Sequence, residues 1–371
     1  MSEKGLKVLA VGDPAVSAYV DQKYGILEGF DGAVDFAVVP WEHYYDTMMD
    51  VFAGRADYDI VMAAGHLWAC DLIRKGYLAQ LDYDFEDILP VIAREMTLDG
   101  KTYLSPSFCD GHIVTYRKSV LRECLGEAWG DVVTPQQFVQ AAKTIAAKTG
   151  KPSLALKADA SEIFTDALPF LRMNGGDVYE GARAVCDAPG VIDGLEQYCS
   201  LKEIAVAGTE HFGNGEVAAA IRENAAPLAV TWSGQMGVVF ADGCADKDDL
   251  GFATFSTAWN VSWSFAVSAR SVKKEEAERF LTYLRSPAID RIAGSVSGAP
   301  VRRESYEKGK STYPWYGCQQ KMFSAARPLP DMECAGEKNG IFYREIAEAF
   351  AGNKTAAQAM ADAQEQINRF G

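Results

Sequence analysis

The chain has 371 residues, of which 48% are hydrophobic and 23% are charged, the proportions of a folded protein with no bias toward disorder. This length exceeds what one ordinary core accommodates, so we expect two domains. The net charge of −15 argues against nucleic acid and anionic membranes as partners, because both require a basic surface. No apolar run could cross a membrane, and the first residues lack the pattern of a secretion signal.

Motifs for metal, cofactor and covalent chemistry are not found. Eight cysteines show no zinc-ligand spacing and are interpreted as buried thiols, which suits a reducing compartment slightly better than an oxidising one. Four histidines form no metal-binding motif, and no nucleophile elbow or dinucleotide fingerprint occurs. The acidic pair Asp82 and Asp84 is assigned to a solvated loop rather than to a glycosidase pair. We therefore predict a protein without enzyme activity, metal or cofactor.

The first part of the chain alternates apolar strands with helices. Strands are predicted at 7–11, 34–39 and 58–62, and helices at 19–30, 41–52 and 68–75. This alternation implies a mostly parallel sheet, whose ligands lie beyond the carboxyl ends of its strands. The residues just after these strands are therefore candidate ligand contacts: Trp41, Glu42, His66 and Trp68.

The stretch from Gly100 to Leu121 is predicted to hold two strands, 102–104 and 113–116, separated by a break at Pro106. Asp110 lies in that break. An acidic side chain there can accept hydrogen bonds from a hydroxyl-rich or cationic ligand, although an ordinary turn aspartate is the alternative. We expect the chain to cross from one domain to the other at this point.

Helix signals are clearest in the middle of the chain. A capping box at 134–137, with proline at the first helical position, predicts a helix that stops near Gly150. A strand at 154–156 and a helix at 163–173 follow, with Glu162 immediately before that helix. The glycine turn at 174–177 lacks the lysine of a phosphate loop and is interpreted as a helix end.

Tryptophans mark the later strands. A strand at 228–231 exits at Trp232, and Gln235 follows in the next turn. Trp259 and Trp263 flank a second predicted crossing, with a strand at 265–267. Further expectations are a helix capped by Ser271 and ended by Pro287, a third connection at 313–316, and two terminal helices, the second with a capping box at 355–358.

Aromatic and polar side chains at strand ends are typical of a pocket in which aromatic rings stack against a sugar ring or an amine and polar groups bind its edge. The alternative is that the tryptophans are core residues.

Six runs of sequence, in order, resemble the extracellular solute-binding proteins of ABC importers, in the maltose-binding-protein-like, sugar-binding branch. The resemblance extends over nearly the whole chain, and the runs that carry it read TMMDVFAGRADYDIVMAAG, GKTYLSPSFCDGHIVTYRKSVL, TPQQFVQAAKTIA, FLRMNGGDVYE, LAVTWSGQM and SFAVSARSVKKEEAERFLTYLRSPAIDRIAGSVSGAPVRRESY.

The resemblance implies a two-lobed α/β fold of the periplasmic-binding-protein type II class, with a ligand cleft and a hinge between the lobes. The lobes would be 1–112 plus 262–310 and 113–261 plus 311–371. His66 matches the family's ligand-contacting turn after its third strand, Asp110 its acidic lip residue and Arg302 the arginine of its PxR motif. Gln235 stands where a tryptophan is common, so the second-lobe platform falls to Trp232 or another residue.

The implied function is the substrate-binding component of an ABC importer, a monomer that closes on a mono- or oligosaccharide and delivers it to a membrane permease. Its compartment would be extracytoplasmic; because the sequence shows no signal peptide, either a leader was removed or the location is cytoplasmic. Alternatives are a receptor for a polyamine or other cation, a cytoplasmic sensor and a glycan-acting enzyme. The candidate ligand-binding residues are Trp41, Glu42, His66, Trp68, Asp110, Glu162, Trp232, Gln235, Trp259, Trp263 and Arg302.

Overall fold

The computed structural model describes residues 5–82, 85–126 and 128–370 and divides the chain into two compact units. Unit 1 comprises Met1–Asp110 and Val261–Tyr313, and unit 2 comprises Gly111–Asn260 and Pro314–Gly371. The chain therefore passes from one unit to the other three times. The first segment of unit 1 ends at residue 110 rather than at the predicted 112, and its second segment spans 261–313 rather than the predicted 262–310. Asp84, one of the acidic pair assigned to a loop, lies outside the described residues.

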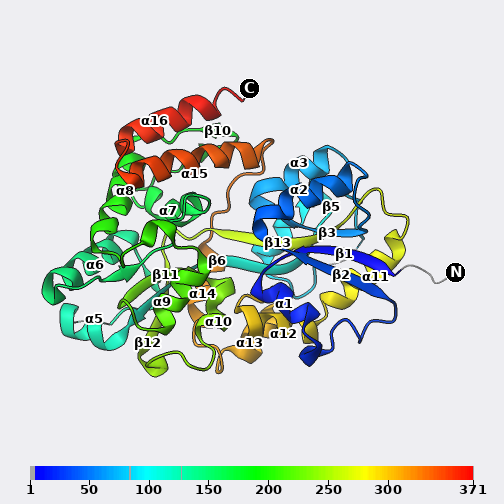
Figure 1. Cartoon of the computed structure of the whole chain (residues 1–371), viewed down its shortest axis with the longest axis horizontal. Coiled ribbons are helices and arrows are strands. Elements are labelled where there is room, and N and C mark those ends of the chain that lie inside the picture. The colour runs from blue at the N-terminus through cyan, green and yellow to red at the C-terminus, as the bar shows by residue number, and fades with distance from the viewer. Residues whose placement is uncertain (1–4, 83–84, 127, 371) are drawn as a thin grey trace. The chain divides into compact units, whose positions relative to one another are not determined.

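The sheet of unit 1 has the strand order β2-β1-β3-β13 (Figure 1). Strand β1 pairs in parallel with β2 and β3, whereas β13 runs antiparallel to β3. The start of β13 therefore lies beside the carboxyl end of β3, with Trp263 opposite Ala64. The strands span Leu6–Val11 (β1), Val34–Val39 (β2), Ile60–Ala64 (β3) and Asn260–Val267 (β13).

Helices cover both faces of this sheet. Figure 1 shows α2 (Trp41–Phe52) and α3 (Cys70–Arg74) on one face, and α1 (Pro14–Val20) and α12 (Pro287–Ser297) on the other. The remaining elements of unit 1 are η1 (Gln22–Tyr24), the π-helical turn η2 (Gly65–Ala69), α4 (Pro90–Glu95), the hairpin of β4 (Thr97–Leu98) and β5 (Lys101–Thr102), α11 (Lys274–Leu284) and α13 (Arg303–Gly309).

Three sequence predictions for helices in unit 1 are wrong in their bounds. The helix predicted at 19–30 overlaps α1 only at the last two residues of α1, and the rest of that range holds the short turn η1 and further turns. Helix α1 begins at Pro14, because Asp13 accepts a hydrogen bond from the backbone of Ala15 at 2.8 Å and proline suits the first helical position. The helix predicted at 68–75 begins as a π-helical turn. Helix α11 has Lys273 rather than Ser271 in its N-cap position, without a side-chain capping bond; the hydroxyl of Ser271 donates to Asp59 at 2.6 Å and accepts from the backbone N–H of Lys273 at 3.0 Å.

The predicted break at Pro106 is also wrong. Ser105–Arg117 forms a single buried strand, β6, in which Asp110 lies mid-strand. Proline is tolerated near the beginning of a strand, where its missing N–H group costs no ladder hydrogen bond. Because β6 continues past residue 110, the first crossing between the units runs through an unbroken strand.

The sheet of unit 2 has the order β7-β12-β6-β11-β8. It is mixed rather than mostly parallel, because β6 runs antiparallel to both β11 and β12, whereas β8 is parallel to β11 and β7 is parallel to β12. The pairing of β11 with β6 places Trp232 opposite His112. The strands other than β6 span Val132–Val133 (β7), Leu154–Ala155 (β8), Leu228–Trp232 (β11) and Leu250–Phe255 (β12).

Unit 2 carries more helices than unit 1, and its capping boxes are confirmed at Thr134 and Thr355. None of the helices in the described ranges has the length and apolar character of a membrane span. The helices are α5 (Lys118–Leu125), α6 (Pro135–Thr149), α7 (Ile163–Leu171), α8 (Pro189–Ser200), α9 (Asn214–Arg222), α10 (Met236–Val239), α14 (Tyr316–Ala325), α15 (Ala335–Ala351) and α16 (Ala356–Ile367). Short elements are β9 (Tyr179–Glu180), β10 (Arg183–Ala184), η3 (Leu201–Ile204), η4 (Thr209–His211), η5 (Ser233–Gln235) and η6 (Lys247–Asp249).

Candidate ligand-binding site

Three tryptophans form a cluster in unit 1. Trp41 begins α2 directly after β2, Trp68 lies in η2 after β3, and Trp263 lies opposite the end of β3. Their ring centroids are 5.7 Å apart for Trp41 and Trp68, and each is 5.9 Å from that of Trp263. Trp41 nevertheless remains 39% exposed. Strands far apart in sequence thus bring three aromatic rings together at one edge of the sheet, with one ring open to solvent.

Further groups surround this cluster. Tyr45 packs against Trp68 with a centroid distance of 5.3 Å and is 43% exposed, and the ring of Phe108 stacks on Trp263 at 6.3 Å. Glu42 is exposed in the first turn of α2, and His66 is half-buried in η2. The open face therefore offers aromatic area together with polar groups, which suits a ligand that has both an apolar face and a polar edge.

Two carboxyl groups influence each other in unit 1. Asp13 follows β1 and caps α1, and Asp110 is 7% exposed on β6. Burial, and then the charge of Asp110, raise the pKa of Asp13 well above its usual range. Two carboxylates in one environment repel each other, so this pair stabilises a bound proton or another hydrogen-bond donor.

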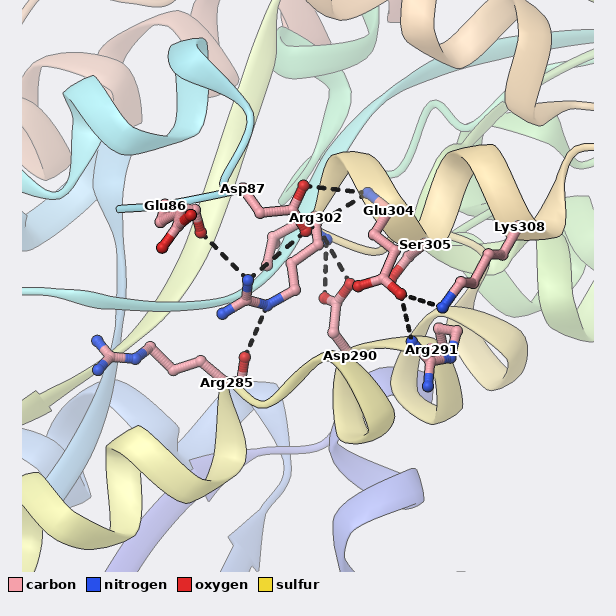
Figure 2. A network of polar contacts seen from close by, with 10 residues as sticks. Glu86, Asp87, Arg285, Asp290, Arg291, Arg302, Glu304, Ser305 and Lys308 are labelled. Atoms are coloured by element: carbon pink, nitrogen blue, oxygen red, sulfur yellow. Dashed lines mark hydrogen bonds and ion pairs between the residues drawn. The ribbon is translucent and has the colours of Figure 1, made fainter. Parts of the chain in front are cut away.

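Arg302 has a different environment from the other candidates (Figure 2). Its guanidinium donates to the backbone carbonyls of Arg285 at 2.7 Å and Glu86 at 3.2 Å, and it forms an ion pair with Asp87 at 3.6 Å. Its backbone N–H donates to Asp290, which also accepts from the hydroxyl of Ser305. These bonds join the chain around Glu86 to the start of α13, so the geometry gives Arg302 a structural role in unit 1.

Unit 2 contains a second cluster, built around Lys157. This lysine follows β8, and its Nζ lies 2.5 Å from Oε2 of Glu162 and 3.1 Å from Oδ2 of Asp166. The other carboxylate oxygen of Asp166 lies 3.3 Å from Nε2 of His112. The same ammonium group lies 4.9 Å from the centroid of the Trp232 ring. The exits of β8 and β11, the first turns of α7 and strand β6 thus converge on one site.

Burial and charge work against each other in this cluster. The side chains of Lys157 and Asp166 are each 3% exposed. Burial favours the neutral form of Lys157, but the carboxylates of Asp166 and Glu162 outweigh it and raise the lysine pKa above its ordinary value. Burial likewise disfavours charge on Asp166, yet Lys157 and His112 lower its pKa. Both groups are therefore ionised at neutral pH.

Trp232 is enclosed rather than open. Its ring lies 4.3 Å from that of His112 and 5.4 Å, edge to face, from that of Trp259, and it is only 6% exposed. Trp259 is fully buried, and Gln235 is 8% exposed in η5. Trp232 and Glu162 therefore belong to the Lys157 cluster, with Trp259 packed against it.

Four residues of these clusters were not predicted as site residues from the sequence: Asp13, His112, Lys157 and Asp166. Asp13 and Lys157 follow strands directly or within two residues, so the rule that selected Trp41 would have found them had it been applied to every strand. His112 and Asp166 carry no such signal, because their placement depends on strand pairing and on the position of α7.

Metal binding and cysteine reactivity are the remaining kinds of chemistry to consider in the described ranges. No three histidine, cysteine, aspartate or glutamate side chains there are arranged to hold a metal ion. Burial raises the pKa of the Cys186 and Cys318 thiols to about 12, so neither is a nucleophile at neutral pH.

The fold is therefore that of two α/β units connected by three crossings, each with polar and aromatic residues at its strand ends. A family model described as "Bacterial extracellular solute-binding protein" matches residues 13–290. The chain belongs to this family.

Solved structures share the fold across the whole chain at low sequence identity. Maltose-bound MalE3 of T. maritima is 19% identical, with a TM-score of 0.86 over 99% of this chain and 100% of that chain. An ABC transporter solute-binding protein from Agrobacterium radiobacter in complex with ribitol is 18% identical, with a TM-score of 0.85 over 99% and 98%. One from Agrobacterium vitis with bound D-mannitol is 20% identical, with a TM-score of 0.82 over 98% and 97%.

Proposed function

We propose that the chain is the receptor of an ABC importer and binds a neutral sugar or polyol. The observation that carries this proposal is the tryptophan cluster of unit 1, in which Trp41 stays 39% exposed beside two other rings. An exposed aromatic face held rigidly by its neighbours suits the apolar face of a sugar ring, while nearby polar groups suit its hydroxyls. The maltose, ribitol and D-mannitol bound by proteins of the same fold support this ligand class.

The proposal includes a transport role without catalysis. A membrane permease would accept the ligand from the closed protein outside the cytoplasm, in keeping with the extracellular type of the family. Bound ligand would leave chemically unchanged, which product analysis after prolonged incubation can check. Conversion of the ligand, with loss of that conversion on neutralising Asp110, would contradict this role.

A cationic ligand is the second candidate, and one observation favours it. Asp13 and Asp110 place two mutually repelling carboxyl groups in the unit that holds the tryptophan cluster, and ammonium groups bind both to carboxylates and over aromatic faces.

A thermal-shift screen of sugars, polyols, polyamines and amino acids separates these candidates. A ligand present at about a hundred times its Kd stabilises the folded state by about 2.7 kcal/mol. We expect neutral sugars or polyols to raise the melting temperature and polyamines to leave it unchanged. Stabilisation by polyamines alone would contradict the proposal.

A further inference from the structure

Lys157 occupies the place over Trp232 that a ligand cation would take. Its Nζ lies 4.9 Å from the centroid of the Trp232 ring, which is within the range of a cation–π contact. The two carboxylates beside it hold this ammonium in position, at 2.5 Å for Glu162 and 3.1 Å for Asp166. In unit 2, the ammonium group of Lys157 therefore occupies the position over the Trp232 ring at which a cationic ligand would bind. A second ammonium at this ring would meet a like charge in a buried environment, where repulsion is strong.

Four buried polar atoms of this cluster have no hydrogen-bond partner within the described residues: Nε1 of Trp232, both ring nitrogens of His112 and Oδ1 of Asp166. Nε2 of His112 and Oδ1 of Asp166 face each other at 3.3 Å, which leaves Nε1 of Trp232 and Nδ1 of His112 without any polar neighbour of this kind. Trp232 is 6% exposed and His112 2%, and the indole nitrogen can only donate. A buried donor without an acceptor is costly, so its occurrence points to a partner that arrives with the ligand.

Ligand classes differ in the hydrogen-bonding groups that they can offer to these nitrogen atoms. A hydroxyl group has two acceptor lone pairs and can accept from Trp232, whereas an ammonium group has donors only. Both carboxylates of this cluster are already paired with Lys157, and Asp166 also lies 3.3 Å from His112. Glu162 is the more open of the two, at 28% exposed.

We propose that Lys157 and Trp232 make unit 2 selective for ligands that present oxygen acceptors and selective against ligands that present an ammonium group. Lys157 is the specificity-determining residue, because it repels a ligand cation, and Trp232 is the hydrogen-bond donor. The inference rests on the proposed function and narrows its ligand class: hydroxyl-bearing sugars and polyols bind, whereas amino sugars and polyamines do not.

Titration calorimetry at pH 7 with matched ligands tests this. The probes are maltose, D-mannitol and ribitol, each paired with an analogue in which one terminal or ring hydroxyl is replaced by an ammonium group, together with spermidine. We expect the parent protein to bind a neutral probe more tightly than its aminated analogue by at least about tenfold. Lys157→Met replaces the lysine by an uncharged side chain of similar length, so the ratio of the aminated probe's Kd to the neutral probe's Kd should fall several-fold.

A second variant should change the preference for the neutral probe in the opposite direction. Glu162→Gln removes one carboxylate and leaves Lys157 paired with Asp166, so the preference for the neutral probe should increase. This variant also keeps the test decisive if Lys157→Met does not fold, as judged by a cooperative thermal transition. Lys157→Arg keeps the charge and should keep the preference.

The outcomes separate this inference from the proposed function. Equal binding of the neutral and aminated probes by the parent, or a ratio unchanged in both Lys157→Met and Glu162→Gln, overturns the inference while carbohydrate binding stands. Binding of spermidine with no binding of any carbohydrate overturns both. Absence of all binding overturns the proposed function, and the selectivity with it.

Discussion

At the scale of single residues, Asp13 caps a helix and at the same time lowers the stability of the folded protein when it is ionised. Its carboxylate caps α1 through Ala15, and the same group is destabilised as an anion by burial and by Asp110. A raised pKa in the folded state means that the folded protein binds protons more tightly than the unfolded chain, so stability decreases as pH rises from the ordinary aspartate pKa toward the raised one.

We therefore expect Asp13→Asn to raise the melting temperature at pH 7, because asparagine keeps the capping acceptor and removes the unfavourable charge. The gain should shrink as pH falls toward the ordinary aspartate pKa, where Asp13 is neutral in both states. Calorimetric melting curves between pH 4 and pH 8 measure it. Asp21→Asn is the matched control, since exposed Asp21 caps the next turn through Lys23 at 2.9 Å and its replacement should change little. A lower melting temperature for Asp13→Asn at neutral pH would contradict this account.

Individual site residues differed in how far the sequence could indicate them. Trp41 and Trp68 were indicated because each follows a strand, and strand ends are where ligands bind in parallel sheets. Arg302 was indicated only by resemblance, and its guanidinium is taken up by the backbone carbonyls of Arg285 and Glu86. The charge cluster of Lys157 and Asp166 depends on distances across separate elements, which no local pattern encodes.

At the scale of elements, the packing of α8 against α7 depends on one glycine. A Cβ atom at Gly194 would lie 2.3 Å from the carbonyl oxygen of Phe170 and 3.0 Å from Cα of Leu171. Both are backbone atoms of α7, the helix that also carries Asp166. Helix α8 can approach α7 this closely only where it has no side chain.

We expect Gly194→Ala to destabilise the protein by about 1–3 kcal/mol, because the backbone of α7 must move. Gly340→Ala is the matched control: it also lies inside a helix, α15, but a Cβ atom there would meet nothing within 4 Å. Alanine should stabilise that helix by about 0.5–1 kcal/mol. Urea unfolding of both variants measures the two effects, and equal effects of the same sign would contradict the packing argument.

Elements with an explicit start signal were predicted well. The capping boxes at Thr134 and Thr355 are present, and α6 ends at Gly150 in the left-handed conformation as expected. Helix α1 was misplaced although Asp13 and Pro14 provide the same kind of signal. Strand β6 was divided because Pro106 was interpreted as a break, whereas its cost depends on whether a partner strand needs its N–H group.

At the scale of the whole molecule, three passages of the chain connect the two units. Short connections bend more easily than packed cores deform, so ligand binding is expected to close the units by hinge motion. Small-angle X-ray scattering should give a smaller radius of gyration with saturating ligand than without. A sugar that produces no thermal shift serves as the control and should leave the radius unchanged. Tight binding with no change in radius would contradict closure.

The central claim is that the chain binds a neutral sugar or polyol through Trp41 and Trp232, and titration calorimetry on variants of these two tryptophans tests it most directly. With the best ligand from the screen, the parent should show one site per chain. Trp41→Ala in unit 1 should weaken binding by roughly 1–3 kcal/mol through loss of aromatic contact area, and Trp232→Phe in unit 2 by about 0.5–1.5 kcal/mol through loss of a hydrogen-bond donor. Trp129→Phe, where the ring packs against Tyr116 at 5.2 Å, should bind like the parent. If either Trp41→Ala or Trp232→Phe binds as tightly as the parent, or if two independent sites appear, the claim is wrong.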